Sequence, residues 1–117
     1  SSQLVCLTDV LRTCAEIMRA KVPDECAEDS ISFYPTLRGV NAEGSRKNIV
    51  HHSINGSFAI REGEWKLCLC PGSGGWSQPR PKQDGSDKLP LVQLFDLAKD
   101  IGEINNLQEK HPEKVKQ

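Results

Sequence analysis

The fold is decided by residues 48–70, which read NIVHHSINGSFAIREGEWKLCLC. Asn55-Gly56 is the dipeptide most typical of a tight β-hairpin turn, and Glu62-Gly63 provides a second turn further along. The segments around these turns alternate in polarity or are rich in β-branched residues, and three strands are predicted there: 48–54, 57–61 and 64–70. With a fourth predicted strand over 91–97, they form an antiparallel four-stranded sheet.

The residues before this sheet carry a helical pattern. Apolar side chains recur at steps of three and four and share one face of a helix predicted over roughly 8–20: Leu7, Val10, Leu11, Cys14, Ile17 and Met18. Thr8 is the predicted N-cap, and Val22-Pro23 ends the helix. A short helix capped by Ser30 is predicted over 30–37, and a C-terminal helix after Pro112. The order of these elements indicates the α+β class.

Length and charge restrict the function. A chain of 117 residues is long enough for one small domain. Fifteen Lys and Arg oppose sixteen Asp and Glu, so the basic excess that nucleic-acid binding requires is absent. No apolar run reaches the roughly 20 residues of a membrane span. The sequence starts at Ser1 rather than Met, without a signal-peptide pattern, which predicts that it belongs to a longer polypeptide.

An odd number of cysteines does not indicate a complete disulfide framework. Five are present: Cys6, Cys14, Cys26, Cys68 and Cys70. Cys68 and Cys70 share one side of a predicted strand and, with His51 and His52, could bind zinc, although the CxxC spacing of common zinc modules is missing. Packing of the thiols as small apolar groups is the competing interpretation.

The segment 71–90 is rich in glycine and proline and is predicted to be a long loop, a kind of segment that is often functional. Its glycines around Ser73 could approach a phosphate, but that requires a helix immediately afterwards, and Pro79 and Pro81 follow instead. We therefore favour a loop that closes over a ligand, with Trp76 as a flat apolar surface. A plain surface loop is the alternative.

His51 and His52 are neighbours in a predicted strand, so their rings point to opposite faces and only one can face a given cleft. Each is also explained as a solvent-exposed histidine. The Asn55-Gly56-Ser57 stretch matches the N-glycosylation pattern, but the turn explains it equally well. The sequence contains no Ser-His-Asp arrangement, HExxH motif or paired-carboxylate motif.

Four stretches, in order, resemble a known family. Residues 7–13 resemble its LTDLLPT pattern, and residues 28–39 its DGxSLLPLLxG pattern. Residues 58–67 resemble xAIRxGxWKL, and residues 94–107 resemble LYDLxxDPxExxNL. The family is that of arylsulfatase-type sulfatases, and the patterns come from its C-terminal end. The His-His-Ser and Gly-Ser-Gly-Gly-Trp stretches are similar to a bacterial branch described as arylsulfatase A or N-acetylgalactosamine-6-sulfatase.

The resemblance implies the C-terminal part of a sulfuric-ester hydrolase. Residues 1–39 would be the last helical segment of its α/β domain, and residues 40–117 its antiparallel-sheet subdomain. Such enzymes use a calcium ion and a formylglycine made within a C/S-x-P/A-x-R motif, and both belong to the N-terminal domain. Cys70-Pro71-Gly72-Ser73 has neither the spacing nor the arginine of that motif. We therefore expect no catalytic residue, metal ligand or cofactor in this chain, and no activity of the chain alone.

In the family, loops of this subdomain border the substrate cleft. The resemblance therefore implies a substrate-binding role for five residues: His51, His52, Gly74, Gly75 and Trp76. The implied partners are the N-terminal catalytic domain and a sulfated carbohydrate or aryl sulfate, with neither nucleic acid nor membrane, and self-association of the isolated chain is a further expectation. The implied location is periplasmic or secreted. An independent carbohydrate- or protein-binding module remains the alternative.

Overall fold

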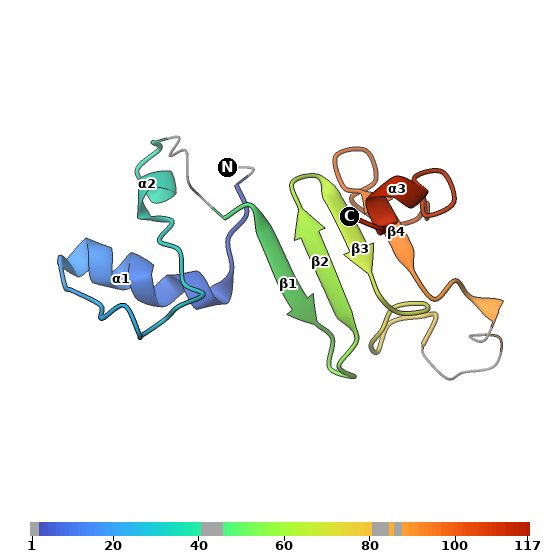
Figure 1. The fold of residues 1–117 in the computed structure, drawn as a ribbon, viewed down its shortest axis with the longest axis horizontal. Helices are drawn as coiled ribbons and strands as arrows, with labels where there is room; N and C mark the ends of the chain where they lie inside the picture. The colour runs from blue at the N-terminus through green and yellow to red at the C-terminus, as the bar shows by residue number, and fades with distance from the viewer. Residues whose placement is uncertain (1–2, 41–45, 81–84, 86–87) are drawn as a thin grey trace. The chain divides into compact units, whose positions relative to one another are not determined.

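The computed structural model describes residues 3–40, 46–80, 85 and 88–117. The chain divides into two compact units, which we call unit 1 (Ser1–Ile49) and unit 2 (Val50–Gln117). The helices at the N-terminal end lie in unit 1, and the sheet and the C-terminal helix follow them in the chain (Figure 1). The predicted α+β class is confirmed.

Unit 1 contains three short helical elements. A 3-10 helix, η1 (Leu7–Asp9), leads directly into α1 (Val10–Met18), and α2 (Tyr34–Leu37) is a single turn. Asp9 rather than the predicted Thr8 takes the N-cap position of α1. The predicted cap Ser30 does not cap α2 either, because its hydroxyl accepts a hydrogen bond from the backbone N–H of Arg12 at 3.2 Å.

The buried carboxylate of Asp9 joins three segments of unit 1, with its side chain 1% exposed. It accepts backbone hydrogen bonds from Cys6 at 2.8 Å and Ile31 at 2.9 Å. The guanidinium of Arg46 binds both carboxylate oxygens, at 3.0 and 2.5 Å. Burial by itself would raise the pKa of Asp9, but the bonds from Arg46 and the two amides outweigh it and hold that pKa below its usual value.

Unit 2 is built on the sheet. Its strands are hydrogen-bonded in chain order: β1 (Asn48–His52), β2 (Phe58–Glu62), β3 (Trp65–Cys68) and β4 (Gln93–Asp96). The pairs β2–β3 and β3–β4 are antiparallel. The predicted four-stranded sheet is therefore confirmed. Strands β1, β3 and β4 are shorter than their predicted ranges, and β2 begins and ends one residue later than predicted.

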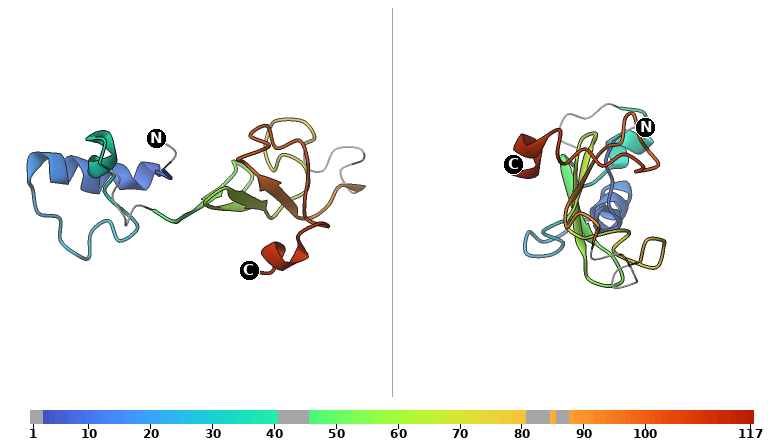
Figure 2. Two further views of the ribbon diagram at one scale, coloured as in Figure 1. Left: turned by 90° about the horizontal axis from the view of Figure 1, so that it is seen from above. Right: turned by 90° about the vertical axis from the view of Figure 1, so that its right-hand side faces the viewer.

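The two faces of the sheet carry different segments of unit 2. Helix α3 (Pro112–Val115) lies on one face, and the loop after β3 lies on the other (Figure 2). The register aligns Ile60, Leu67 and Leu94 across the strands on the α3 face. Leu94 and its neighbour Phe95 are the centre of the buried apolar part of this unit.

The chain after β4 is tied back to that strand by an asparagine. The Oδ1 atom of Asn106 accepts hydrogen bonds from the backbone N–H of Leu94 at 3.0 Å and of Gln108 at 3.1 Å. Its amide donates to the carbonyl of Val92 at 3.3 Å. Asn106 thus satisfies the backbone N–H of Leu94 at the outer edge of β4. Among the described helices, none is long and apolar enough to cross a membrane.

Candidate functional site

Two adjoining hollows lie on the sheet face opposite α3, and together we call them the polar groove. The larger has a volume of about 390 Å³ and the smaller of about 120 Å³. They are continuous, because three residues line both of them: Lys66, Cys68 and Ser73. Strand β3 thus supplies the floor, and the loop after it supplies one wall.

An ion pair lies at the centre of the groove. The Nζ atom of Lys66 contacts both carboxylate oxygens of Glu103, at 2.6 and 2.7 Å. The backbone of Glu103 has a φ of 55°, a left-handed conformation that is uncommon outside glycine. The turn after β4 therefore holds its carboxylate against β3, and the charge of Lys66 is balanced where it faces the groove.

The loop wall is fixed to the sheet by side-chain hydrogen bonds. The Gln93 amide donates to the carbonyls of Cys70 at 2.8 Å and Gly72 at 2.7 Å. The Ser53 hydroxyl donates to the carbonyl of Gly74 and lies 3.3 Å from the backbone N–H of Ser57. One hydroxyl therefore joins the loop to the β1–β2 hairpin.

Two glycines of the loop allow its close approach. Gly74 has a φ of 65°, and a Cβ atom there would lie 2.7 Å from the sulfur of Cys70. Gly72 has a φ of 62°, and its Cβ atom would lie 2.4 Å from the carbonyl oxygen of Pro79. Both positions require glycine for conformation and for space. The two glycines therefore determine the shape of the loop.

The side chains of the two predicted histidines point to opposite faces of the sheet. Both border the smaller hollow of the groove. The His52 ring contacts the Phe58 ring edge-on at 6.0 Å, and Phe58 shares its face of β2 with Ile60. Because neighbouring strand residues alternate, His51 points to the other face, the face of the groove.

The three predicted loop residues lie beside the groove rather than in its lining. Gly74 is buried, Gly75 is half-buried, and neither lines the hollows described above. The Trp76 side chain is 73% exposed, and its carbonyl accepts a hydrogen bond from Arg80 at 2.7 Å. Trp76 is thus presented to solvent at the edge of the loop.

Several groove residues were not predicted from the sequence. They are polar residues from β3, β4 and the turns that follow: Lys66, Ser73, Gln93 and Glu103. Alternation in β3 does place Lys66 opposite the apolar Trp65 and Leu67, a signal that this strand has a polar face. Its pairing with Glu103 has no such local signal.

The residues of the zinc interpretation lie around one hollow. Although His51, His52, Cys68 and Cys70 all border the smaller hollow, no three His, Cys, Asp or Glu side chains among the described residues come together as a metal site. Burial raises the pKa of the Cys68 thiol, which keeps it protonated at neutral pH. The packing interpretation fits this cysteine better.

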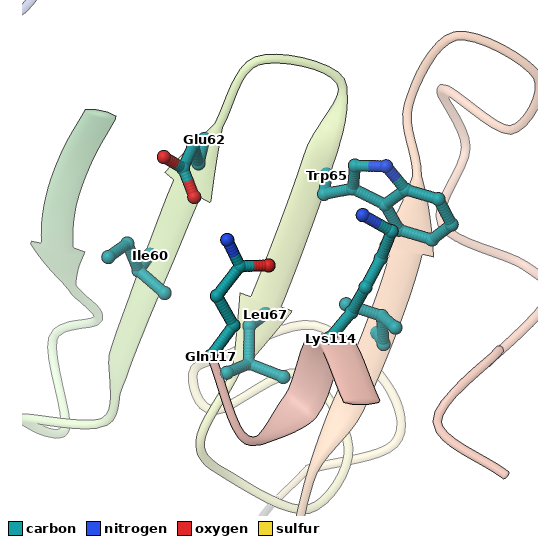
Figure 3. Close-up of a pocket in the computed structure, with 7 residues that line it drawn as sticks. Ile60, Glu62, Trp65, Leu67, Lys114 and Gln117 are labelled. Carbon is teal, nitrogen blue, oxygen red and sulfur yellow. The ribbon is translucent and has the colours of Figure 1, made fainter. Parts of the chain in front are cut away.

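A third hollow, of about 300 Å³, lies on the α3 face of the sheet (Figure 3). Its floor is apolar, with Ile60, Leu67 and Trp65 among the lining residues. The Nζ atom of Lys114 lies 4.8 Å from the centre of the Trp65 ring, and His111 contacts the same ring edge-on. Because this ring already has partners from the C-terminal segment, we assign the candidate site to the polar groove.

Comparison with known proteins gives a consistent result. No family model matches the chain. An N-acetylgalactosamine-6-O-sulfatase of Bacteroides thetaiotaomicron is 32% identical over 112 residues, which cover 93% of this chain and 21% of that protein. A solved structure described under glycosaminoglycan metabolism by the same species is 30% identical, with a TM-score of 0.67 over 92% of this chain and 22% of its own.

A third relative supports the fold alone. The structure of a 2-O GAG sulfatase has 23% identity and a TM-score of 0.60, again over 92% of this chain and 21% of its own. The chain therefore spans about a fifth of the length of the relatives that it matches.

Proposed function

We propose that this chain, which aligns with the C-terminal part of sulfatases, belongs to a sulfuric-ester hydrolase and borders its substrate cleft. The observation that carries the proposal is the agreement of sequence and fold with sulfatases over nearly the whole chain. An independent binding module is not favoured, because the helical unit and the sheet align together rather than the sheet alone.

The polar groove supports a positioning role. Its lining combines hydroxyl groups, amide groups and a balanced ion pair, which suit the many hydroxyls of a carbohydrate better than a single sulfate anion. His51 faces this groove, and Trp76 offers an exposed aromatic surface on the adjoining loop. We therefore assign His51, Lys66 and Trp76 to contacts with the saccharide, and Gly74 and Gly75 to the loop that presents Trp76. His52, whose ring contacts Phe58, would support the adjoining hairpin.

The reacting groups would come from elsewhere in the polypeptide. Hydrolysis of a sulfate ester needs strong stabilisation of developing negative charge, which a calcium ion and a formylglycine would supply in the N-terminal part. The substrate class is then a sulfated carbohydrate, in keeping with the relatives named for an aminosugar 6-O-sulfate and for glycosaminoglycans. The location that fits such a substrate is periplasmic or secreted.

Kinetics of the longer polypeptide test the proposal. His51→Ala and Trp76→Ala should each lower kcat/KM for a sulfated saccharide by roughly tenfold or more, with a much smaller effect on a small aryl sulfate. Leu91→Ala, which truncates an exposed apolar side chain in the same unit, is the matched control. Equal losses on both substrates would contradict a role in saccharide binding. Absence of all sulfate-ester hydrolysis by the unmodified polypeptide would contradict the enzyme class.

A further inference from the structure

The charge of the polar groove is balanced within the groove itself. Among the residues that the structure describes, the Lys, Arg, Asp and Glu side chains that line it are Lys66 and Glu103. Both are partly buried, with 20% and 33% of the side chain exposed, and they form the ion pair described above. A carboxylate or sulfate that entered the groove would therefore meet a cation that is already neutralised, and it would lie beside the carboxylate of Glu103.

The ion pair can still bind a hydroxyl group. An ammonium group has three N–H donors, and that of Lys66 contacts the two oxygens of Glu103, which leaves one donor over. Each carboxylate oxygen also keeps a second lone pair. A hydroxyl both donates and accepts, so it can use the remaining donor and a remaining lone pair together. An anion can use only the donor, and the carboxylate repels it.

Two side chains of the loop wall have donated their hydrogens to the backbone. The two N–H groups of the Gln93 amide go to the carbonyls of Cys70 and Gly72, which leaves the amide oxygen as an acceptor. The Ser73 hydroxyl donates to the carbonyl of Ser77 at 2.6 Å. These fixed side chains therefore favour a ligand that brings its own donors, as a sugar hydroxyl does and an ionised carboxylate does not.

The turn after β4 keeps Glu103 in place. The backbone N–H of Glu103 donates to the Asp100 carbonyl at 3.1 Å. The carboxylate of Asp100 accepts from the backbone N–H groups of Ile104 at 2.9 Å and Asn105 at 2.7 Å, just after Glu103 in the chain. Because the backbone is bonded on both sides of Glu103, its carboxylate would stay on Lys66 when a ligand arrives.

We propose that Glu103 is a specificity-determining residue, which neutralises Lys66 so that the groove accepts an uncharged sugar unit and rejects a uronate. This inference rests on the proposed function and adds to it the class of sugar that lies next to the sulfated one. Lys66 without its partner would be a half-buried cation suited to a carboxylate, so the choice between the two sugar classes would depend on this one acidic side chain.

Two disaccharides that differ at a single carbon test the proposal. One contains a hexuronate, and the other is its carboxyl-reduced form, with a hydroxymethyl group in place of the carboxylate; neither carries sulfate. Their binding to the longer polypeptide is measured by saturation-transfer NMR. The reduced form should bind at least about tenfold more tightly, because the carboxylate would lose its hydration without gaining an unpaired cation. Equal binding of the two, or no binding of either, would overturn the proposal.

Charge variants assign the preference to Glu103. Glu103→Gln should strengthen binding of the hexuronate by roughly tenfold or more and change that of the reduced form by less than about threefold. Adding Lys66→Gln to this variant removes the cation as well and should restore the original preference. A loosened fold would weaken both ligands and would not be reversed in this way. Glu62→Gln, the same change on the α3 face, should leave both affinities unchanged. A Glu103→Gln variant without a selective gain for the hexuronate would overturn the proposal.

Hydrolysis of the sulfated forms of both disaccharides is assayed on the same samples. Hydrolysis without any selectivity that depends on Glu103 overturns this inference alone. The expected selectivity of binding in a polypeptide that hydrolyses no sulfate ester overturns the proposed function alone.

Discussion

Asp9 and Lys66 show how single charged side chains organise this small protein. Each binds one oppositely charged partner through two contacts, Arg46 for Asp9 and Glu103 for Lys66. Removing one partner of a buried pair costs about 3–5 kcal/mol, because the remaining charge is left without compensation. The almost fully buried Asp9 belongs to that class, and it also satisfies two backbone amides.

The lowered pKa of Asp9 predicts a specific dependence on pH. Its stabilising effect is complete above the pKa of an unfolded Asp, about 3.9, and is lost as the pH falls through the lower folded pKa. Asp9→Asn should destabilise unit 1 by about 3 kcal/mol at neutral pH and remove this acid-dependent part. Urea unfolding followed by helical circular dichroism across a pH series measures both. If the free energy of unfolding falls equally with decreasing pH in both proteins, the role given to Asp9 is contradicted.

A second prediction at this scale compares two glycines. Gly74→Ala and Gly56→Ala both place a side chain on a left-handed backbone, with φ of 65° and 77°, at a cost of about 1–2 kcal/mol. At Gly56 an added Cβ meets no atom within 4 Å, whereas at Gly74 it meets the Cys70 sulfur. Chemical denaturation should therefore give Gly74→Ala a free energy of unfolding about 1–3 kcal/mol lower than that of Gly56→Ala. Similar stabilities of the two variants would mean that the loop can move away from the added methyl group at Gly74 without loss of stability.

At the scale of elements, the segment after β4 explains a pattern that the sequence displays only as spaced polar residues. The Asp96 carboxylate accepts from the backbone of Ala98 at 3.2 Å, and that of Asp100 accepts from Ile104 at 2.9 Å. Asn106 then pairs with the backbone of Leu94. These side chains replace the hydrogen bonds of regular structure, so the turn keeps its shape without a helix.

Asn106→Ala should therefore destabilise unit 2 by about 1–3 kcal/mol, because it leaves the N–H of the buried residue Leu94 without its acceptor. The exposed neighbour Asn105 is the matched control, and Asn105→Ala should change stability by less than about 0.5 kcal/mol. Amide hydrogen exchange at Leu94 reports the local effect. Unchanged exchange at Leu94 in Asn106→Ala would show that this bond does not hold β4.

The existence of the main elements was predictable from the sequence, because turns and periodicity are local signals. The direction that α1 faces was not, since the polar positions Asp9, Thr13 and Glu16 are as periodic as the apolar ones. The choice depends on partners such as Ile31, which lies 22 residues from Asp9. The groove was predictable only in part, because some of its residues are paired with partners that are distant in the sequence. His51 could be recognised as a candidate because it is a histidine. The Lys66–Glu103 pair could not be recognised, because its members lie 37 residues apart in the sequence.

At the scale of the whole molecule, the chain is expected to be catalytically silent by itself. No cysteine of the chain begins a C-x-P/A-x-R motif, and the serine form of the pattern occurs only at residues 57–61, in the chain that leads into strand β2. The groove residues are proposed to bind and orient a ligand rather than to stabilise a departing sulfate. The isolated chain should therefore release no sulfate above buffer from an aryl sulfate or a sulfated saccharide. The measurement is sulfate release by repurified chain over a range of concentrations. Turnover that survives repurification and scales with the chain would contradict this expectation.

The Ser53 hydroxyl has a mechanical consequence for any ligand of the groove. By contacting both the β1–β2 hairpin and the Gly74 carbonyl, it connects two of the segments that border the groove. A groove whose walls stay at a fixed distance would admit ligands by their cross-section and would not close around them. Selectivity would then reside in the shape of the rigid saccharide ring rather than in an induced fit. Loosening this one hydroxyl contact would widen the range of accepted ligands before it weakened the binding of the preferred one.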